Sequence, residues 1–345
     1  MQDILTCAMG LDIHRDVIVA CLAKGELGTD PEIEIRSFST LIPEMRKLRD
    51  WVLEAECRYV AMESTGIYWQ PIYEMLEPCF DGQISILVVN ARHMKNVPGR
   101  KTDMRDAQWI ATLLRAGLLK GSFIPDKTFR ELRHLTRYRK SIVRDITAQK
   151  NRIDKFLQSS GFRFTAFLSD AFGASGRNII RHLMEYGNIS REALDRCLKT
   201  QTRKRIDEIL IALNGSLSEH QRGFLRMIFG HLEALEQHRH TVEDAITKEI
   251  TKHEEALSLL CSIPGIDVTA AAAIIAEIGT DMSAFPDSQH ICSWAGLSPG
   301  NNESAGKRKS AHINKGNPYL KSMLCEVGWV ISGKRSLYLS GWYWR

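Results

Sequence analysis

The sequence predicts an α/β domain at the N-terminus, a middle region of long helices, and a mainly helical C-terminal domain. Strand patterns alternate with helix patterns early in the chain, two long stretches show helical spacing of apolar residues, and short helices flank Gly/Pro turns near the end. A chain of 345 residues is also too long for one compact core. We therefore place the domains at residues 1–125, 126–258 and 259–345.

The first domain is predicted to begin with three strands in a meander. Residues 5–13 and 16–22 alternate as strands around a tight turn at His14-Arg15, and residues 32–38 form the third. A helix follows, with apolar residues at Ile42, Met45, Leu48, Trp51 and Val52. Next come a strand at 59–62, a helix at 68–76, a strand at 84–89, and a helix beginning at Asp103. This order is that of an RNase H or RuvC-like domain.

In such a domain, acids on the first strand, the fourth strand and a late helix converge. This chain has acids in those places: Asp12, Glu63, Asp103 and Asp106. Asp103 and Asp106 are three residues apart and share a helix face, although acids at a helix start can also serve only as caps. Because Mg²⁺ prefers carboxylate oxygens, the four acids together predict a magnesium site.

Composition favours a soluble cytoplasmic protein that contacts nucleic acid. The net charge is only +5, so a nucleic-acid partner requires the cations to cluster. The eight cysteines contain no C-x-x-C pair, which argues against a zinc ribbon or a disulfide framework. No leader pattern opens the chain, and the most apolar stretch, residues 269–278, is too short to span a bilayer.

The middle region contains a basic helix. Residues 128–160 carry one apolar stripe surrounded by nine cations and only three acids, as in a coiled-coil arm. We expect this face to contact a phosphate backbone rather than only water, and select Arg137, Arg144 and Arg152 as candidates. Residues 224–260 predict a second long helix, either the antiparallel partner of the first or a dimer seam. Residues 173–217 suggest short helices without identifiable chemistry.

The C-terminal domain offers two nucleic-acid motifs. Residues 262–270, with Pro264-Gly265, resemble a helix-hairpin-helix element, in which backbone N–H groups face a phosphate. Asp267 stands where many such motifs have glycine, so the alternative is a purely structural turn. Later, a serine flanked by flexible residues, Ser304, precedes a basic run. The cations that could face phosphate there are Lys307, Arg308, Lys309 and Lys315. Chemistry alone leaves open a solvated loop or a nucleophile.

Three segments together resemble the DEDD motifs of the IS110 family of transposases. They are Gly10-Leu11-Asp12, Met62-Glu63-Ser64-Thr65-Gly66-Ile67-Tyr68, and Lys101-Thr102-Asp103-Met104-Arg105-Asp106-Ala107. The resemblance continues through Val89-Asn90-Ala91 and the second half of the chain.

The resemblance implies a DNA transposase or recombinase. Ser304, just before the basic stretch, is then the nucleophile, with Ser298 and Ser310 as other candidates. Asp12, Glu63, Asp103 and Asp106 then hold Mg²⁺ at the scissile phosphate. It also implies DNA substrates, a structured guide RNA and a homo-oligomer of two to four chains, and we expect the half-sites to meet across protomers. Relatives continue for several helices past the equivalent of residues 327–332, so we expect a shortened C-terminal domain with exposed aromatics after Tyr338.

Two other functions fit the same residues. A site-specific DNA invertase of the Piv type shares the motifs and would differ in acting at fixed sites. A RuvC-like nuclease would use its metals to activate water, with the second half only binding DNA. Replacing Ser304 separates the nuclease from the recombinase, because water attack does not need that hydroxyl.

Overall fold

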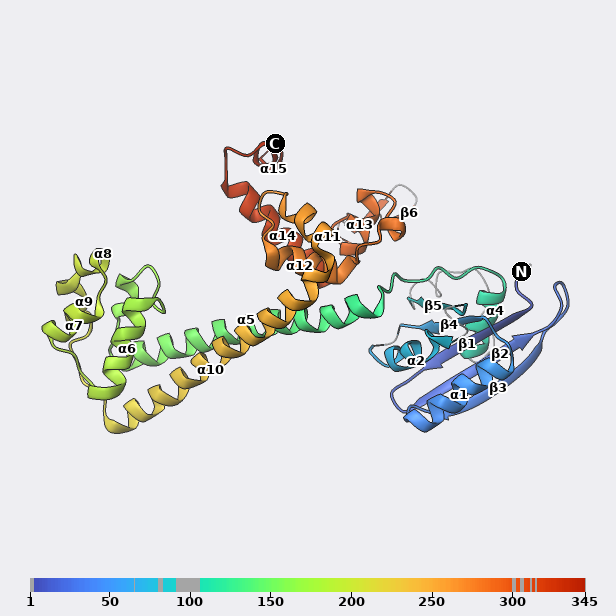
Figure 1. The fold of residues 1–345 in the computed structure, drawn as a ribbon, viewed down its shortest axis with the longest axis horizontal. Coiled ribbons are helices and arrows are strands. Elements are labelled where there is room, and N and C mark those ends of the chain that lie inside the picture. The colour runs from blue at the N-terminus through green and yellow to red at the C-terminus, as the bar shows by residue number, and fades with distance from the viewer. Residues whose placement is uncertain are drawn as a thin grey trace. The chain divides into compact units, whose positions relative to one another are not determined.

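The computed structural model of the chain describes residues 3–64, 66–79, 83–90, 106–299, 302–304, 307–310, 312–313 and 315–344. Asp103 lies outside them. The chain folds as two compact units, Met1–Ile124 and Pro125–Arg345, and each is described by itself (Figure 1). Among the helices in the described ranges, none is both long and apolar enough to cross a bilayer.

The first unit is built on a mixed five-strand sheet in the order β3-β2-β1-β4-β5. β2 is antiparallel to both β1 and β3, whereas β4 is parallel to β1 and β5. This RNase H-like arrangement confirms the fold predicted for the N-terminal part. The strands are β1 (Cys7–Ile13), β2 (Val17–Lys24), β3 (Glu32–Ser39), β4 (Tyr59–Glu63) and β5 (Ser85–Val89).

Helices cover both faces of the sheet. Alternation along β1 sends Met9 and Leu11 to one face, where they share a core with α1 (Ile42–Glu54) and α2 (Trp69–Leu76). Ala8 faces the other side, where it packs with Ile110 of α4 (Asp106–Arg115). The small residues on the α4 side let that helix lie close to the strands, which matters for the acids described below.

Two long antiparallel helices, α5 (Lys127–Ser159) and α10 (Glu219–Ile250), form the second unit's arm (Figure 1). The Phe156 and Phe224 rings pack at 5.0 Å toward one end, and Arg139 pairs with Glu243 at 2.7 Å farther along. From Phe156 to Arg139 the residue numbers fall along α5, while their partners rise along α10 from Phe224 to Glu243. The two helices therefore run antiparallel. The second long helix is therefore the antiparallel partner of the first, as one of the two alternatives predicted; a dimer seam and a coiled-coil supercoil stay predictions.

The second long helix differs at both ends from the predicted 224–260 span. It begins earlier because Ser218 and Gln221 form a capping box around its first turn. It ends at Ile250, so the prediction of one helix through residue 260 is wrong. His253 leaves helical geometry (φ −122°, ψ 44°), and its ring packs 4.8 Å from that of Phe129. The chain passes through η3 (Thr251–His253) into the separate helix α11 (Glu254–Cys261).

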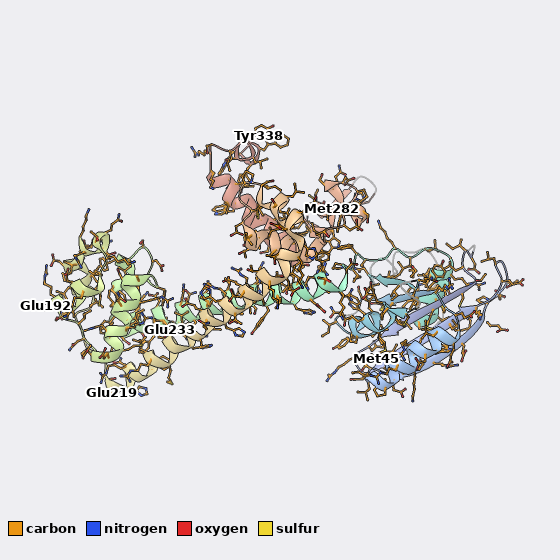
Figure 2. All side chains as sticks on the ribbon, in the orientation of Figure 1. Met45, Glu192, Glu219, Glu233, Met282 and Tyr338 are labelled. Carbon is orange, nitrogen blue, oxygen red and sulfur yellow. The ribbon has the colours of Figure 1, made fainter. Side chains whose placement is uncertain are left out.

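Short helices follow α5 and pack near the start of α10. Arg177 pairs with Glu236 at 2.6 Å, and Arg181 pairs with Glu233, labelled in Figure 2, at 2.8 Å. These ion pairs join the first of the short helices to the arm. The elements are η2 (Phe164–Phe167), α6 (Ala174–Tyr186), α7 (Arg191–Cys197), α8 (Thr200–Arg203) and α9 (Ile206–Ala212).

The C-terminal part is helical apart from one small hairpin. Its elements are α12 (Val268–Ile278), η4 (Met282–Ala284), α13 (Ser288–Ala295), β6 (Asn302–Ser304), β7 (Lys307–Ser310), α14 (Pro318–Gly333) and α15 (Tyr338–Tyr343). The turn between α11 and α12 places Gly265 at φ +91°, a conformation that favours glycine. Asp267 accepts a hydrogen bond from the Ala270 N–H at 2.7 Å and so caps α12. A helix-hairpin-helix contact with DNA stays a prediction.

The last helix exposes aromatic side chains, as expected from the sequence. Tyr338, labelled in Figure 2, is 78% exposed, and Trp342 and Trp344 are also exposed. Trp344 nevertheless donates its indole N–H to the Ser332 carbonyl at 3.1 Å. The tail is therefore tied to the end of α14 while its rings stay accessible.

Candidate nucleic-acid processing site

Asp12 and Glu63 lie side by side at the carboxyl edge of the sheet. Leu11 of β1 pairs with Met62 of β4 in parallel register, and the two acids are the next residue on each strand. Adjacent strands are about 4.8 Å apart, so the two side chains are neighbours. Alternation from Ala8 and Ala61, which both pack under α4, places both acids on the α4 face. The side chain of Asp12 is 14% exposed, and its Oδ2 lies 3.2 Å from Nε2 of His14.

Asp106 reaches the same face because α4 begins directly over β1. A Cβ on Gly10 would lie 2.2 Å from the Ala107 carbonyl oxygen and 2.4 Å from the Ala111 nitrogen, so only glycine allows this approach. Asp106 is the residue before Ala107, and Asp12 is two residues beyond Gly10. The structure thus brings three of the four predicted acids to one region of the sheet.

The other end of α4 is anchored by a buried arginine. Arg115 is 1% exposed and donates hydrogen bonds to the carbonyls of Leu5, Gly25 and Glu26 at 3.0, 3.2 and 2.8 Å. Its own backbone carbonyl accepts the N–H groups of Ile4 and Leu5. These bonds fix the helix that carries Asp106 relative to β1.

The described acids do not by themselves form a closed metal site. Within the described ranges, no group of three or more His, Cys, Asp or Glu side chains could hold a metal ion. The predicted fourth acid, Asp103, lies outside those ranges. The donor set is nevertheless chemically suitable, because carboxylate oxygens are what Mg²⁺ prefers.

The candidate serine lies on the β6–β7 hairpin in the second unit. Ser304 is the last residue of β6 and pairs with Lys307 of β7, while Glu303 pairs with Arg308. The predicted basic run is therefore the partner strand of the serine. Ser310 lies at the far end of β7, opposite Asn302, and Ser298 lies before the hairpin. Lys315 is exposed on the segment that leads into α14.

The base of this hairpin is closed by backbone contacts. Pro299 and Ile313 form an isolated antiparallel bridge, and the Asn317 N–H donates to the Trp294 carbonyl at 2.8 Å. Gly316 crosses Gly296 so closely that a Cβ would lie 2.2 Å from the Gly296 nitrogen. The two legs of the segment that carries Ser304 are thus held together where they leave α13 and enter α14.

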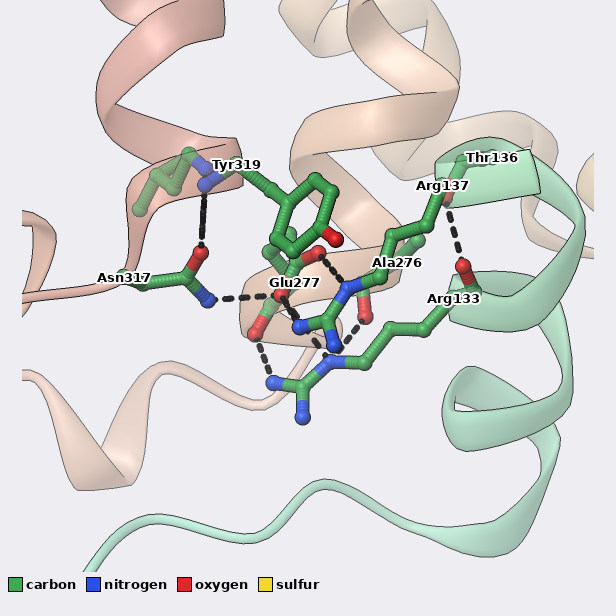
Figure 3. Close-up of polar contacts among 8 residues, drawn as sticks. Arg133, Thr136, Arg137, Ala276, Glu277, Asn317 and Tyr319 are labelled. Carbon is green, nitrogen blue, oxygen red and sulfur yellow. Dashed lines mark hydrogen bonds and ion pairs between the residues drawn. The ribbon is translucent and has the colours of Figure 1, made fainter. Parts of the chain in front are cut away.

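The predicted cations of α5 are of two kinds: one is paired with an acid of another helix, and two are exposed to solvent. Arg137 makes a bidentate ion pair with Glu277 of α12, both contacts at 2.8 Å, and stacks over the Tyr319 ring at 4.3 Å (Figure 3). Arg144 is exposed and has no ion pair or hydrogen bond within the part of the chain that is described. Arg152 is exposed as well and, among the residues that the structure describes, donates only to Gln149 of its own helix. Arg137 is therefore mainly a tertiary contact, whereas Arg144 and Arg152 face solvent.

A groove of about 550 Å³ lies beside these cations, between α5, α10, α12 and α14. Its lining from α5 is basic, with Arg137, Arg139, Lys140 and Arg144, whereas Glu243, Glu277 and Glu326 bring acids from the other helices. The mixed charges make this groove as a whole less suited to phosphate than the exposed guanidinium groups of Arg144, which also lines the groove, and Arg152, which together we call the outer face of α5.

Sequence reasoning missed Glu277 and Asn317. Glu277 is 1% exposed, and it accepts the Asn317 side-chain amide at 2.6 Å in addition to the arginine contacts (Figure 3). Two signals were available. Glu277 is the one acid within the apolar run 268–278, and Asn317-Pro318 is typical of a helix start.

The sheet order, with acids at the carboxyl ends of β1 and β4 and at the start of α4, defines a domain of the RNase H-like class. Residues 9–161 match the DEDD transposase family of IS110 elements, and residues 257–342 match the transposase IS116/IS110/IS902 family. The chain therefore belongs to the IS110 family of transposases.

Two curated proteins are similar to this chain. A putative transposase, y4qE, of Sinorhizobium fredii is 23% identical over 247 residues, which cover 69% of this chain and 51% of that protein. An uncharacterized 43.6 kDa protein of insertion element IS110 from Streptomyces coelicolor is 28% identical over 239 residues, which cover 64% of this chain and 58% of that protein. The chain thus spans little more than half the length of these relatives.

Proposed function

We propose that this chain is a DNA transposase that cuts and rejoins DNA through Ser304, assisted by a magnesium site formed by Asp12, Glu63, Asp103 and Asp106. The observation that carries the proposal is the convergence of acids from β1, β4 and α4 on one face of an RNase H-like sheet. It falls within the stretch, residues 9–161, that matches the DEDD family.

The acids would bind and orient the scissile phosphate through Mg²⁺. Bound there, Mg²⁺ would neutralise phosphate charge and leave coordination positions for phosphate oxygens. The chain's own contribution is geometric: the β1–β4 register fixes two carboxylates side by side, and the contact of α4 with Gly10 brings Asp106 to the same face.

In the proposed chemical step, the Ser304 hydroxyl oxygen attacks the phosphorus and loses its proton. The bond from phosphorus to the bridging 3′ oxygen breaks, and that oxygen leaves as a DNA 3′-hydroxyl after taking up a proton. The product is a phosphoserine joined to the 5′ end, so a 3′-hydroxyl can later reverse the step without an external energy source. Lys307 is the ladder partner of Ser304, and in this proposal Lys307, Arg308 and Lys309 would supply the positive charge that faces that phosphate.

A structured guide RNA and a homo-oligomer belong to the same proposal. The outer face of α5 carries Arg144 and Arg152 toward solvent, which supports its assignment to a phosphate backbone. Arg137 contributes less to that face, because Glu277 already holds its guanidinium.

The acid site is tested by Asp12→Asn and Asp106→Asn, which remove one negative charge each while keeping side-chain size. We expect both variants to lose cleavage of a donor DNA junction in Mg²⁺ and to retain the parent melting temperature. Full cleavage by both variants would remove the metal site from the proposal.

The nucleophile is tested by stopping the reaction with denaturant and mapping any protein–DNA adduct by peptide mass. We expect an adduct at Ser304 that Ser304→Ala abolishes together with strand exchange, whereas Ser298→Ala and Ser310→Ala retain both. An adduct at Ser298 or Ser310 would move the assignment. Cleavage without any adduct, giving free 5′-phosphate ends, would instead support the water-using nuclease.

A further inference from the structure

Glu277 of α12 has a buried carboxylate that contacts both α5 and the residue just before α14. Arg133 and Arg137, one turn apart on α5, approach it, with Nε of Arg133 at 3.2 Å from Oε2 and the Arg137 fork at 2.8 Å from both oxygens. Asn317, just before α14, donates its amide to Oε2 at 2.6 Å (Figure 3). A buried carboxylate requires such partners, because an unpaired one is costly to desolvate.

The arginines are themselves fixed by this arrangement. Arg133 also donates to the Ala276 carbonyl at 2.9 Å and to that of Glu277. Burial lowers the pKa of Arg133 to about 10, and the nearby Glu277 carboxylate opposes that shift, so the guanidinium stays protonated at neutral pH. Glu277 therefore remains opposite two fixed positive charges.

Asn317 connects this carboxylate to the hairpin that carries Ser304. Its Oδ1 accepts the N–H groups of Tyr319 and Leu320 at 3.0 and 3.1 Å, and its backbone N–H donates to the Trp294 carbonyl. The side-chain oxygen is thus committed to the cap of α14, which leaves the amide N–H to bind Glu277. Asn317 therefore bonds both to the segment at the base of the hairpin and, through Glu277, to α12 and α5.

We propose that Glu277 is a positioning residue for the Ser304 hairpin, acting through Asn317. This inference rests on the proposed function, in which Ser304 attacks DNA. Packing alone would need only the two arginines, because they already join α5 to α12. The Asn317 bond is the additional contact, and it acts on the base of the hairpin.

The sharpest test is Asn317→Asp. Aspartate keeps the size and the capping oxygen, but it loses the N–H donor and places a second carboxylate next to Glu277. We expect a loss of adduct formation of roughly tenfold or more, seen in kcat rather than in KM, because a hydrogen bond to a charged group has about that effect on an opening equilibrium. Trypsin cleavage after Lys307, Arg308 or Lys309 should accelerate to a similar degree.

The paired variant Asn317→Asp with Glu277→Gln exchanges the two side-chain types. One carboxylate remains near Arg133 and Arg137, and an amide can again donate across the contact with its direction reversed. We expect this double variant to recover much of the adduct rate and the trypsin resistance. Asn178→Asp makes the same chemical change on α6, where the side chain donates to the Cys197 carbonyl and to no other residue in the described ranges, and it should leave both unchanged.

The readouts separate failure of this inference from failure of the proposed function. If the parent forms no adduct at Ser304 but Asn317→Asp still opens the hairpin to trypsin, the positioning role of Glu277 and Asn317 holds and the nucleophile assignment fails. If the parent forms the adduct and Asn317→Asp changes neither the adduct rate nor trypsin cleavage, the positioning role is refuted. The positioning role is also refuted if Asn317→Asp lowers the adduct rate and the double variant recovers none of it. The hydrogen bond between residues 277 and 317 would then not be the cause of the loss.

Discussion

Gly10→Ala tests whether close packing of α4 on β1 places Asp106 beside Asp12 and Glu63. The added Cβ would lie 2.2 Å from the Ala107 carbonyl oxygen and 2.4 Å from the Ala111 nitrogen, whereas ordinary contacts begin at 3.4 Å. Both obstacles are backbone atoms of α4, which cannot rotate aside as a side chain could. The helix must therefore move away from the strand by roughly 1 Å, the shortfall between these distances and ordinary contact, and such backbone shifts are how an overpacked core responds.

The cost follows from two opposing effects. Replacing glycine within a strand ordinarily stabilises a protein by about 0.5–1 kcal/mol, because the unfolded chain loses freedom. Overpacking costs about 1–3 kcal/mol, and here the backbone of a helix fixed at its far end by Arg115 has to yield. We expect a net loss of about 1–2 kcal/mol in the free energy of unfolding of the first unit.

Urea unfolding and hydrogen exchange of peptides from β1 and α4 would measure this effect, with DNA cleavage assayed on the same samples. Gly230→Ala is the matched control, since its Cβ would enter open space within α10 and should stabilise the helix by about 0.5–1 kcal/mol. Unchanged stability and unchanged exchange in α4 would refute the packing argument. Faster exchange in α4 with full cleavage would refute the link between the Gly10 contact and the position of Asp106.

Two further predictions use single side chains. Arg144→Gln and Arg152→Gln should each lower the slope of log affinity against log salt for a structured RNA by about 0.7–0.9, whereas Arg137→Gln should mainly lower the melting temperature; unchanged slopes would make the outer face of α5 solvated surface. Iodoacetamide labelling of Cys7 should be half-maximal near pH 7. A hydrogen bond from the Cys57 thiol lowers the pKa of Cys7 to about 7, burial opposes this shift, and the charge of Lys24 adds to it. Burial raises the pKa of Cys21 to about 11, so that thiol should stay unlabelled at pH 8, and Cys57→Ala should move the Cys7 midpoint upward; a midpoint that does not move would refute the thiol contact.

Local patterns were sufficient to predict the first unit's fold. Alternation along residues 5–13 and 32–38 predicts strands, and the order of strands and helices then limits the topology to a mixed sheet. The placement of Asp12 and Glu63 follows from that topology, because the carboxyl ends of neighbouring parallel strands share one edge. The role of Gly10 could not be predicted, since it depends on how closely a helix nearly 100 residues later approaches the strand.

Pairing at a distance explains what sequence reasoning missed in the second unit. Counting charges along residues 128–160 finds Arg137 among nine cations, but its partner Glu277 lies 140 residues away. Charge counted over a short stretch of sequence therefore cannot distinguish the two arginines. Arg137 is paired with a buried acid, whereas Arg144 faces solvent. The break at Thr251–His253 carries no glycine or proline that would mark it in the sequence, and the His253 ring packs on Phe129, which lies far away in the chain.

Both candidate half-sites are carried by elements that a buried charge holds in place. Arg115 fixes the far end of α4 through three backbone carbonyls, and Glu277 fixes the start of α14 through Asn317. A buried charge is a poor means of gaining stability, because its desolvation offsets most of the attraction, whereas removing its partner costs about 3–5 kcal/mol. What such a charge does supply is a geometry that tolerates few alternatives, since each donor must meet its acceptor. Phosphoryl transfer depends on that kind of fixed geometry, because most of its acceleration comes from positioning and electrostatics around the phosphate.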